Sequence, residues 1–375
     1  MAVDTSRALL FLLLALCQAI VVAQEEPLIS RTEEVVEAEP LERIPPDYPL
    51  RELRRGAEGW VAMSFMVSET GEVTDAMVES SSGGEGFERA ALEALQKWRY
   101  RPAQVYGQAV ESSLDTVIYF AVSSGDPLRP PRKVVQSYRD LQAALAANDL
   151  PKADALLTEL RARQDRKIYE EAWLNWLEYV YLEVTKGDAE EQRERLRAAI
   201  GFDKKRTYLD PETFVVGLAR LFALDIRAGD LGGALDAYER LTSDEAAQRA
   251  DRYATIQSTL EAAVREIEQV VAGDRTLSFR GQIGEHDFWV HRLVRRSFSI
   301  ANIEGSLEEL SVRCPHRRVT FTPLTGEQTW TVPASYGTCR VFLKGGQGTT
   351  FELYEFPDAS AEPATALPAP LVPLD

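Results

Sequence analysis

The chain has 375 residues, of which 45% are hydrophobic and 27% charged, and it carries a formal net charge of −17. This length exceeds one ordinary hydrophobic core and predicts about two to four compact units. The acidic balance argues against nucleic acid as the main partner, because neutralising phosphates requires clustered Lys and Arg.

The N-terminal residues 1–23 combine Arg7 with an apolar run and end in V-V-A at 21–23. A basic flank, a short apolar stretch and a final small residue are typical of a secretory signal peptide, which predicts export. An N-terminal membrane anchor remains open, because the apolar character extends to Val22. Residues 24–43 are rich in Glu and lack periodicity, so we expect a solvated acidic linker.

Residues 44–123 are predicted to fold as strand, strand, helix, strand. Apolar residues alternate along 59–67, T-G-E at 70–72 supplies a turn, and a second strand follows. A helix is expected from Phe87, with Trp98 on its buried face, and Pro102 ends it near Tyr100. Residues 113–122 then form a strand rich in β-branched and aromatic side chains. The residues expected to be buried in the first strand are Val61, Met63, Phe65 and Val67.

A Pro-rich linker at 124–132 leads into residues 133–272, where the apolar period changes to that of helices. N-D-L-P-K-A at 148–153 is echoed by G-D-A-E-E-Q at 187–192 and by G-D-L-G-G-A at 229–234. Repeats at this spacing predict stacked helical hairpins. The turn followed by an amphipathic helix resembles the tetratricopeptide repeat, although a generic helical bundle remains equally open.

Residues 273–357 contain many short apolar runs separated by Gly, Pro and Asn, which predicts a small β-sandwich. Cys314 and Cys339 are expected to form a disulfide there, and a metal site that adds His316 is the less favoured alternative. Residues 358–375 are rich in Pro and Ala and are predicted to be a disordered tail. The whole pattern predicts a multidomain α+β protein.

No residue pattern indicates an enzyme, a cofactor or a metal. His286, His291 and His316 are the three histidines of the chain. Residues five apart on a strand point to opposite faces, so His286 and His291 are not expected to bind the same metal ion. The Gly-rich stretch at 344–350 is expected to be a hairpin turn rather than a phosphate-binding loop. If the sandwich did carry catalysis, the first cluster to test would be Glu285, His286 and Asp287.

Three stretches within residues 45–122 together resemble the C-terminal domain of TonB, the energy transducer of Gram-negative envelopes. P-D-Y-P at 46–49 is similar to the family's entry motif, and the stretch 59–73 is similar to its first hairpin. F-E-R-A-A-L-E-A-L-Q-K-W-R-Y-R-P-A at 87–103 is similar to its helix and exit. The resemblance implies a small sheet covered by a helix, in a periplasmic protein.

The resemblance also implies binding by β-augmentation, in which a partner's extended segment adds to the last strand of the sheet. In the family this segment belongs to an outer-membrane receptor. The positions that match the family's contacts are Tyr48, Pro49, Leu114, Asp115, Thr116, Val117, Ile118, Tyr119 and Phe120. For Tyr48, simple packing in a turn is an equally open interpretation.

The chain departs from the family at its N-terminus. The family's transducers carry a membrane helix with a His-containing motif, whereas the apolar segment here contains no His. The acidic linker reaches about 70 Å even when fully extended. We therefore expect a periplasmic, non-enzymatic binding module without its own motor coupling. A scaffold that acts through the helical repeats and a membrane-anchored energy transducer remain open.

Overall fold

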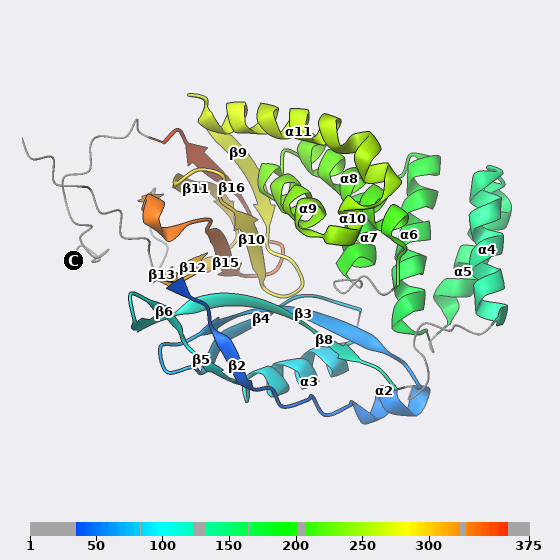
Figure 1. Cartoon of the computed structure of the whole chain (residues 1–375), viewed down its shortest axis with the longest axis horizontal. Coiled ribbons are helices and arrows are strands. Elements are labelled where there is room, and N and C mark those ends of the chain that lie inside the picture. The colour runs from blue at the N-terminus through cyan, green and yellow to red at the C-terminus, as the bar shows by residue number, and fades with distance from the viewer. Residues whose placement is uncertain are drawn as a thin grey trace, which may run out of the picture.

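The computed structural model describes residues 35–82, 84–122, 132–163, 166–201, 208–322 and 328–358. It confirms a multidomain α+β chain with three parts (Figure 1). These parts are the first unit (residues 35–122), the helical unit (132–272) and the sandwich (277–356). The predicted signal segment, the connector at 124–131 and the tail beyond Asp358 lie outside the described residues. No described helix is both long and apolar enough to span a membrane.

The first unit is built around a three-stranded antiparallel sheet with the order β4-β3-β8. Helix α3 lies on one face of this sheet, as Figure 1 shows. Two small sheets, β1-β6-β7 and β2-β5, complete the unit. Its elements are β1 Val35–Val36, β2 Glu39–Glu42, α2 Leu50–Arg55, β3 Gly59–Val67, β4 Val73–Ser81, α3 Glu85–Leu95, β5 Arg99–Arg101, β6 Ala103–Val105, β7 Gln108–Val110 and β8 Ser112–Phe120.

Two predictions for the first unit are wrong in detail. Helix α3 ends at Leu95 rather than near Tyr100, because Tyr100 lies in strand β5, which pairs with β2. Strand β2 itself lies in the stretch 24–43 that was expected to be a linker. Its side chains are exposed, which keeps the two Glu carboxylates in water, while its backbone pairs with β5. Trp98 is buried as predicted.

The helical unit consists of successive antiparallel helices. Its three repeated motifs lie at the turns inside the hairpins α4/α5, α6/α7 and α8/α9. At these turns Asn148, Lys186 and Gly229 have positive φ, and an Asp side chain then caps the next helix. The helices are α4 Arg132–Ala146, α5 Leu150–Ala162, α6 Ile168–Thr185, α7 Ala189–Gly201, α8 Pro211–Ala228, α9 Leu231–Ser243, α10 Glu245–Gln248 and α11 Asp251–Ala272.

The sandwich contains two four-stranded antiparallel sheets, with the orders β10-β15-β12-β13 and β14-β11-β16-β9. Cys314 and Cys339 form the predicted disulfide. The stretch 344–350 is not a hairpin turn, because β15 and β16 belong to different sheets. The strands are β9 Leu277–Gln282, β10 Phe288–Arg292, β11 Ser297–Glu304, β12 Leu307–Cys314, β13 Arg317–Phe321, β14 Thr329–Thr331, β15 Arg340–Gly345 and β16 Thr350–Phe356.

Strand β3 is buried on both faces, because all three parts of the chain pack around the sheet that contains it. Val61 and Phe65 pack in the core under α3. On the opposite face, Trp60 and Ala62 belong to the core of the helical unit. The sandwich covers the neighbouring part of this face, where Arg313 contacts Met77 of β4. Figure 1 shows the helices and the sandwich side by side above the sheet, with α3 below it.

Candidate functional site

Strand β8 forms one edge of the first unit's sheet. Within the described residues it pairs in a sheet only with β3, in an unbroken antiparallel register from Val67↔Ser112 to Gly59↔Phe120. The predicted strand is therefore present, and it is an edge. Such an edge presents backbone N–H and C=O groups to an incoming strand.

Alternation of the backbone decides which groups of β8 point away from β3. The Ser113 N–H donates to the carbonyl oxygen of Pro315 in the sandwich at 3.1 Å, so Ser113 points outward. Because outward and inward residues alternate along an antiparallel strand, the backbones of Asp115, Val117 and Tyr119 also point outward. The sandwich thus occupies the first outward position, and no described strand pairs with the outward backbones of Asp115 and Val117.

The predicted contact residues of β8 divide into two groups. Ile118 and Phe120 are buried in the core under α3, and Leu114 packs against the same core, while Thr116 is half-buried. On the other face, Val117 and Tyr119 pack against the core of the helical unit. The Asp115 carboxylate lies 3.3 Å from the guanidinium of Arg340. A partner strand would therefore meet mainly the backbone of β8 rather than its side chains.

Tyr48 and Pro49 have local roles at the entry to the sheet. Tyr48 donates its hydroxyl hydrogen to the carbonyl oxygen of Ala57 at 2.5 Å, and its ring meets the rings of Phe87 and Phe120 edge-on. Burial, with a contribution from nearby Glu side chains, raises the pKa of Tyr48 to about 12. Pro49 precedes α2 and accepts the first helical hydrogen bond from Leu53. Packing is thus the observed role of Tyr48.

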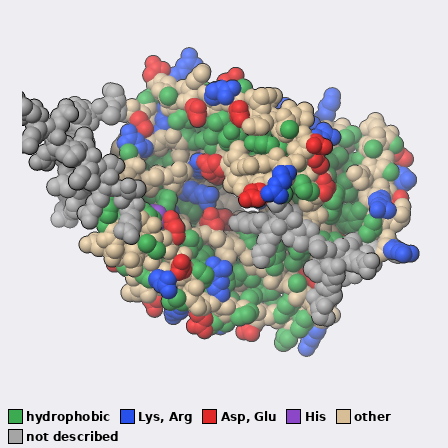
Figure 2. Space-filling view, in the orientation of Figure 1, with side chains coloured by type: hydrophobic (Ala, Val, Ile, Leu, Met, Phe, Trp, Pro, Cys, Tyr) green, Lys and Arg blue, Asp and Glu red, His purple; other side chains and the backbone are tan. Residues whose placement is uncertain are grey.

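A charge cluster at the junction with the sandwich was not predicted from the sequence. Asp75 lies in β4 with φ of 49° and contacts the cationic groups of Arg313, Arg318 and Lys344. Burial by itself raises the pKa of Asp75, but these three cations outweigh it and hold the pKa below its ordinary value. In the space-filling view of Figure 2, acidic and basic side chains gather around a hollow near the centre of the face shown.

The other candidate groups of the sandwich do not come together. The disulfide removes both thiolates that the alternative metal site required. His316 lies 3.2 Å from Glu37, and His291 is buried 2.7 Å from Glu355. The described residues contain no group of three or more His, Cys, Asp or Glu that could hold a metal ion. The cluster Glu285, His286 and Asp287 is exposed between β9 and β10.

Residues 44–122 match the family model described as the Gram-negative bacterial TonB protein C-terminal. Protein TonB of Xanthomonas campestris pv. campestris (strain B100) is 34% identical over 79 residues, which are 21% of this chain and 35% of that protein. Protein tonB2 of Pseudomonas aeruginosa is 32% identical over 78 residues, or 21% of this chain and 29% of that protein. The predicted resemblance of this stretch to the TonB C-terminal domain is thereby confirmed.

Two solved structures are similar over the same part. The solution structure of the Pseudomonas aeruginosa TonB C-terminal domain is 28% identical, covers 24% of this chain and 91% of its own, and has a TM-score of 0.22. The tonb2 protein from Vibrio anguillarum is 39% identical, with 24% and 84% covered and a TM-score of 0.20. This chain matches only about a third of the length of the curated relatives, since 35% of the first is covered.

Proposed function

We propose that this chain is a periplasmic, TonB-like protein of the Gram-negative envelope that binds an extended segment of a partner by β-augmentation on β8. The partner class that the relatives suggest is an outer-membrane receptor of TonB-dependent transport. The observation that carries the proposal is the position of β8 as a sheet edge within a TonB C-terminal domain. The helical unit and the sandwich then serve to hold this edge and to dock further surfaces.

The usable part of the edge is shorter than the sequence suggested. Pro315 accepts the outward hydrogen bond of Ser113, so a partner strand would pair with the backbones of Asp115 and Val117. Main-chain hydrogen bonds of this kind supply affinity without requiring particular side chains on β8. This agrees with the packing of Val117 and Tyr119 against the helical unit. Because their side chains are packed there, they are not expected to contact the partner.

We further propose that the chain lacks its own motor coupling. The support is the absence of His from the apolar segment at residues 8–22, because the family's coupling motif contains His. A membrane-anchored transducer is the competing function. Sequencing the N-terminus of the mature protein tests this point, since an intact N-terminus would favour the anchored transducer.

Replacing Val117 with Pro is expected to abolish partner binding, because Pro removes the outward N–H while the inward ladder to β3 keeps its bonds. A photo-crosslinkable residue placed at the exposed Asp115, followed by mass spectrometry of the envelope, measures this. The expected crosslink is to an extended terminal segment of an outer-membrane receptor, and Val117→Pro should remove it.

The matched control is Val117→Ala, which shortens the same side chain and keeps the N–H. This variant should retain the crosslink, because the proposed ladder depends on the backbone. Both variants must show the far-ultraviolet circular dichroism of the unchanged chain. A folded Val117→Pro variant with an undiminished crosslink to the same segment would remove β8 as the binding strand.

A further inference from the structure

The turn between strands β12 and β13 lies against the edge of β8. Cys314 and Arg317 are opposite each other at the end of this strand pair, so the chain reverses within two residues. We call this segment the stop turn (residues 314–317). Its Pro315 carbonyl oxygen accepts the outward hydrogen bond of Ser113 at 3.1 Å. The stop turn therefore lies where a partner strand would otherwise pair with Ser113.

Two ion pairs flank the contact between Ser113 and the stop turn. On one side Arg318 lies 3.2 Å from Glu111, and on the other Arg340 lies 3.3 Å from Asp115. These four side chains are 25–39% exposed, and ion pairs with this much contact with water contribute little to stability. The hydrogen bond from Ser113 therefore depends on how firmly the stop turn itself is held.

The disulfide holds the stop turn at its base. Arg313 and Arg340 form the last pair at this end of the β12/β15 ladder, and Cys314 and Cys339 lie one step beyond it. A covalent bond thus takes the place of the next ladder pair. The end of a ladder opens more easily than its middle, whereas a disulfide keeps the two segments together. Because Cys314 directly precedes Pro315, the disulfide fixes the start of the stop turn.

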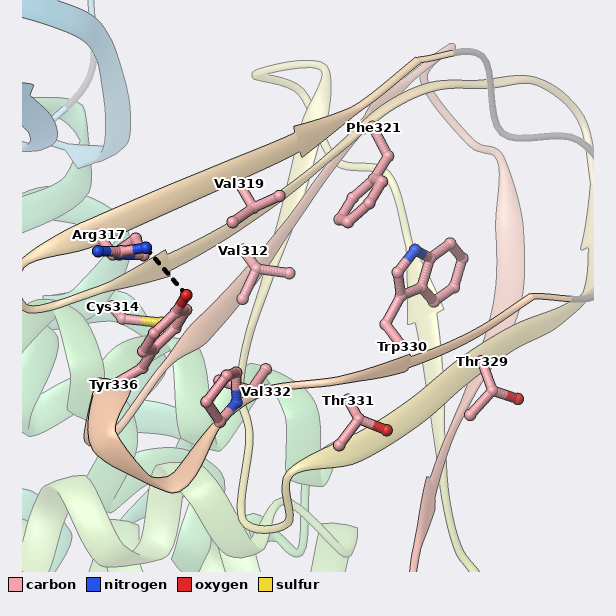
Figure 3. A pocket seen from close by; sticks show the side chains of 11 residues that line it. Val312, Cys314, Arg317, Val319, Phe321, Thr329, Trp330, Thr331, Val332 and Tyr336 are labelled. Atoms are coloured by element: carbon pink, nitrogen blue, oxygen red, sulfur yellow. Dashed lines mark hydrogen bonds between the residues drawn. The ribbon is translucent and has the colours of Figure 1, made fainter. Parts of the chain in front are cut away.

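The loop before β15 makes two further contacts near the disulfide. The Arg317 guanidinium donates to the Tyr336 hydroxyl oxygen at 3.1 Å and lies 4.8 Å from the centre of the Tyr336 ring. Figure 3 shows this pair beside Cys314. The Cys339 carbonyl oxygen accepts from the Leu293 N–H at 3.0 Å. Arg317 is exposed, and a cation–π contact at an exposed site is weak, so the disulfide is the stronger tie on the stop turn.

We propose that the disulfide between Cys314 and Cys339 sets the end of the binding strand. It holds the stop turn on Ser113 and so limits a partner's ladder to the outward backbones of Asp115 and Val117. This inference rests on the proposed function, because it concerns the length of the same edge. Each outward residue of an antiparallel strand offers one N–H and one C=O. Releasing the stop turn would therefore lengthen the edge by one outward residue.

A fixed end also gives a partner strand a defined register. Because the partner would meet mainly the backbone of β8, side chains do little to set its register, and such strands are prone to slip. A partner strand that slips by two residues keeps its side chains on the same faces and can form the same backbone bonds. The stop turn opposes slippage in one direction, since a strand shifted towards Ser113 would collide with Pro315.

Amide hydrogen exchange of the full chain, followed by NMR, tests whether the disulfide holds the stop turn. In the unaltered chain the Ser113 amide should exchange at least about tenfold more slowly than an unstructured amide. Replacing Cys314→Val and Cys339→Ala together removes the disulfide and keeps apolar side chains in the sandwich core. In this cysteine variant the Ser113 amide should exchange at least about tenfold faster, while the inward amide of Thr116 stays protected.

A photo-crosslinkable residue in place of Ser113 reports whether a partner reaches this end of the edge. With the disulfide intact it should give no crosslink. In the cysteine variant it should capture the same receptor segment that the crosslinker at Asp115 captures. A disulfide with a merely structural role would weaken the fold without adding a contact, so a gained crosslink separates positioning from stability.

The matched control is Leu353→Ala, which removes a fully buried side chain from the same sandwich core and keeps the disulfide. It should show neither the faster Ser113 exchange nor the new crosslink, and either result in this control would overturn the proposal. Strand β15 must stay protected in both variants. Dithiothreitol, which is oxidised as it reduces the disulfide to two thiols, is the second measurement and should speed Ser113 exchange in the same way.

The outcomes for the stop turn and for partner binding can be told apart. Exchange of Ser113 at unstructured rates in the unaltered chain would overturn the proposal without any variant. Unchanged Ser113 exchange after loss of the disulfide would overturn it even where the crosslink at Asp115 is found. The expected exchange without any crosslink at Asp115 would support the stop turn and contradict the proposed function.

Discussion

Asp75→Asn is expected to lower the free energy of unfolding by about 3–5 kcal/mol. Asp75 is the carboxylate that compensates Arg313, which is 2% exposed between β4 and the sandwich. Removing one partner of a buried pair leaves the other charge without compensation in a medium of low polarity. Asn has nearly the same shape and tolerates the positive φ at this position, so the loss reports on charge and not on backbone strain.

Urea unfolding followed by tryptophan fluorescence measures this difference. Glu72→Gln is the matched control, because Glu72 forms an exposed ion pair with Arg99 at 3.9 Å in the same unit and such a pair contributes less than about 1 kcal/mol. Similar losses in the two variants would contradict a special role for the Asp75 cluster. The same pair of variants also shows whether the sandwich and the first unit are energetically coupled.

The contribution of Asp75 should depend on pH in a defined direction. The surrounding cations hold the pKa of the folded Asp75 carboxyl below its ordinary value of 3.8. The unfolded chain therefore takes up the proton first, and the stabilisation is complete above the ordinary pKa and is lost as the pH falls through the folded pKa. The difference in unfolding free energy between the unchanged chain and Asp75→Asn should be constant near neutral pH and shrink below pH 3.8. A difference that stays constant into this acidic range would contradict the assignment.

Arg295→Met is expected to cost at least about 3 kcal/mol of unfolding free energy. Arg295 is 3% exposed, and its guanidinium donates to the carbonyl oxygens of Val270, Val271, Gly273, Arg275 and Glu355. Two of these carbonyls lie in the last turn of α11, where the regular helical donors run out; that of Val270 also accepts from the Gly273 N–H at 3.3 Å. Met keeps an apolar stem of similar length but removes all five of these hydrogen bonds from a buried site.

The neighbouring residue provides the control for Arg295. Arg296→Met removes an exposed guanidinium that lies 3.0 Å from Asp358, and it should cost less than about 1 kcal/mol. Arg295→Lys should fall between the two, because an ammonium offers three donors and not the planar fork of five. Hydrogen exchange at the end of α11 should quicken only in the Arg295 variants. Unchanged exchange there would show that Arg295 does not hold this helix to the sandwich.

Much of the architecture follows from local patterns in the sequence. The spacing of apolar residues predicted β3, β4, β8 and a sandwich of short strands, and the Asp-containing turns predicted the helical hairpins. The pattern failed where a strand depends on a distant partner. Strands β2 and β5 are short, polar segments that pair across about sixty residues of sequence, for example Glu39 with Arg101. Their own composition therefore does not indicate a ladder.

The composition of β3 carried a signal that simple alternation conceals. Counting only Val61, Met63, Phe65 and Val67 predicts one buried face, although Trp60, Ala62 and Met66 make the run almost continuously apolar. A continuous apolar run is typical of a strand that is buried on both sides. The second face is in fact covered by the helical unit and the sandwich, and this is also where Val117 and Tyr119 of the candidate edge are packed.

The sequence by itself determined the class of each part, the likeness of residues 44–122 to the TonB C-terminal domain, the disulfide and the strand that carries the candidate site. Only the tertiary structure decided how much of that strand is accessible. Asp75 and Arg313 are 238 residues apart, and no local periodicity relates two such positions. The contact of Ser113 with Pro315 likewise joins residues that are far apart in the sequence. Periodicity reports which face of an element avoids water, whereas the partner that covers this face is chosen by the packing of the whole chain.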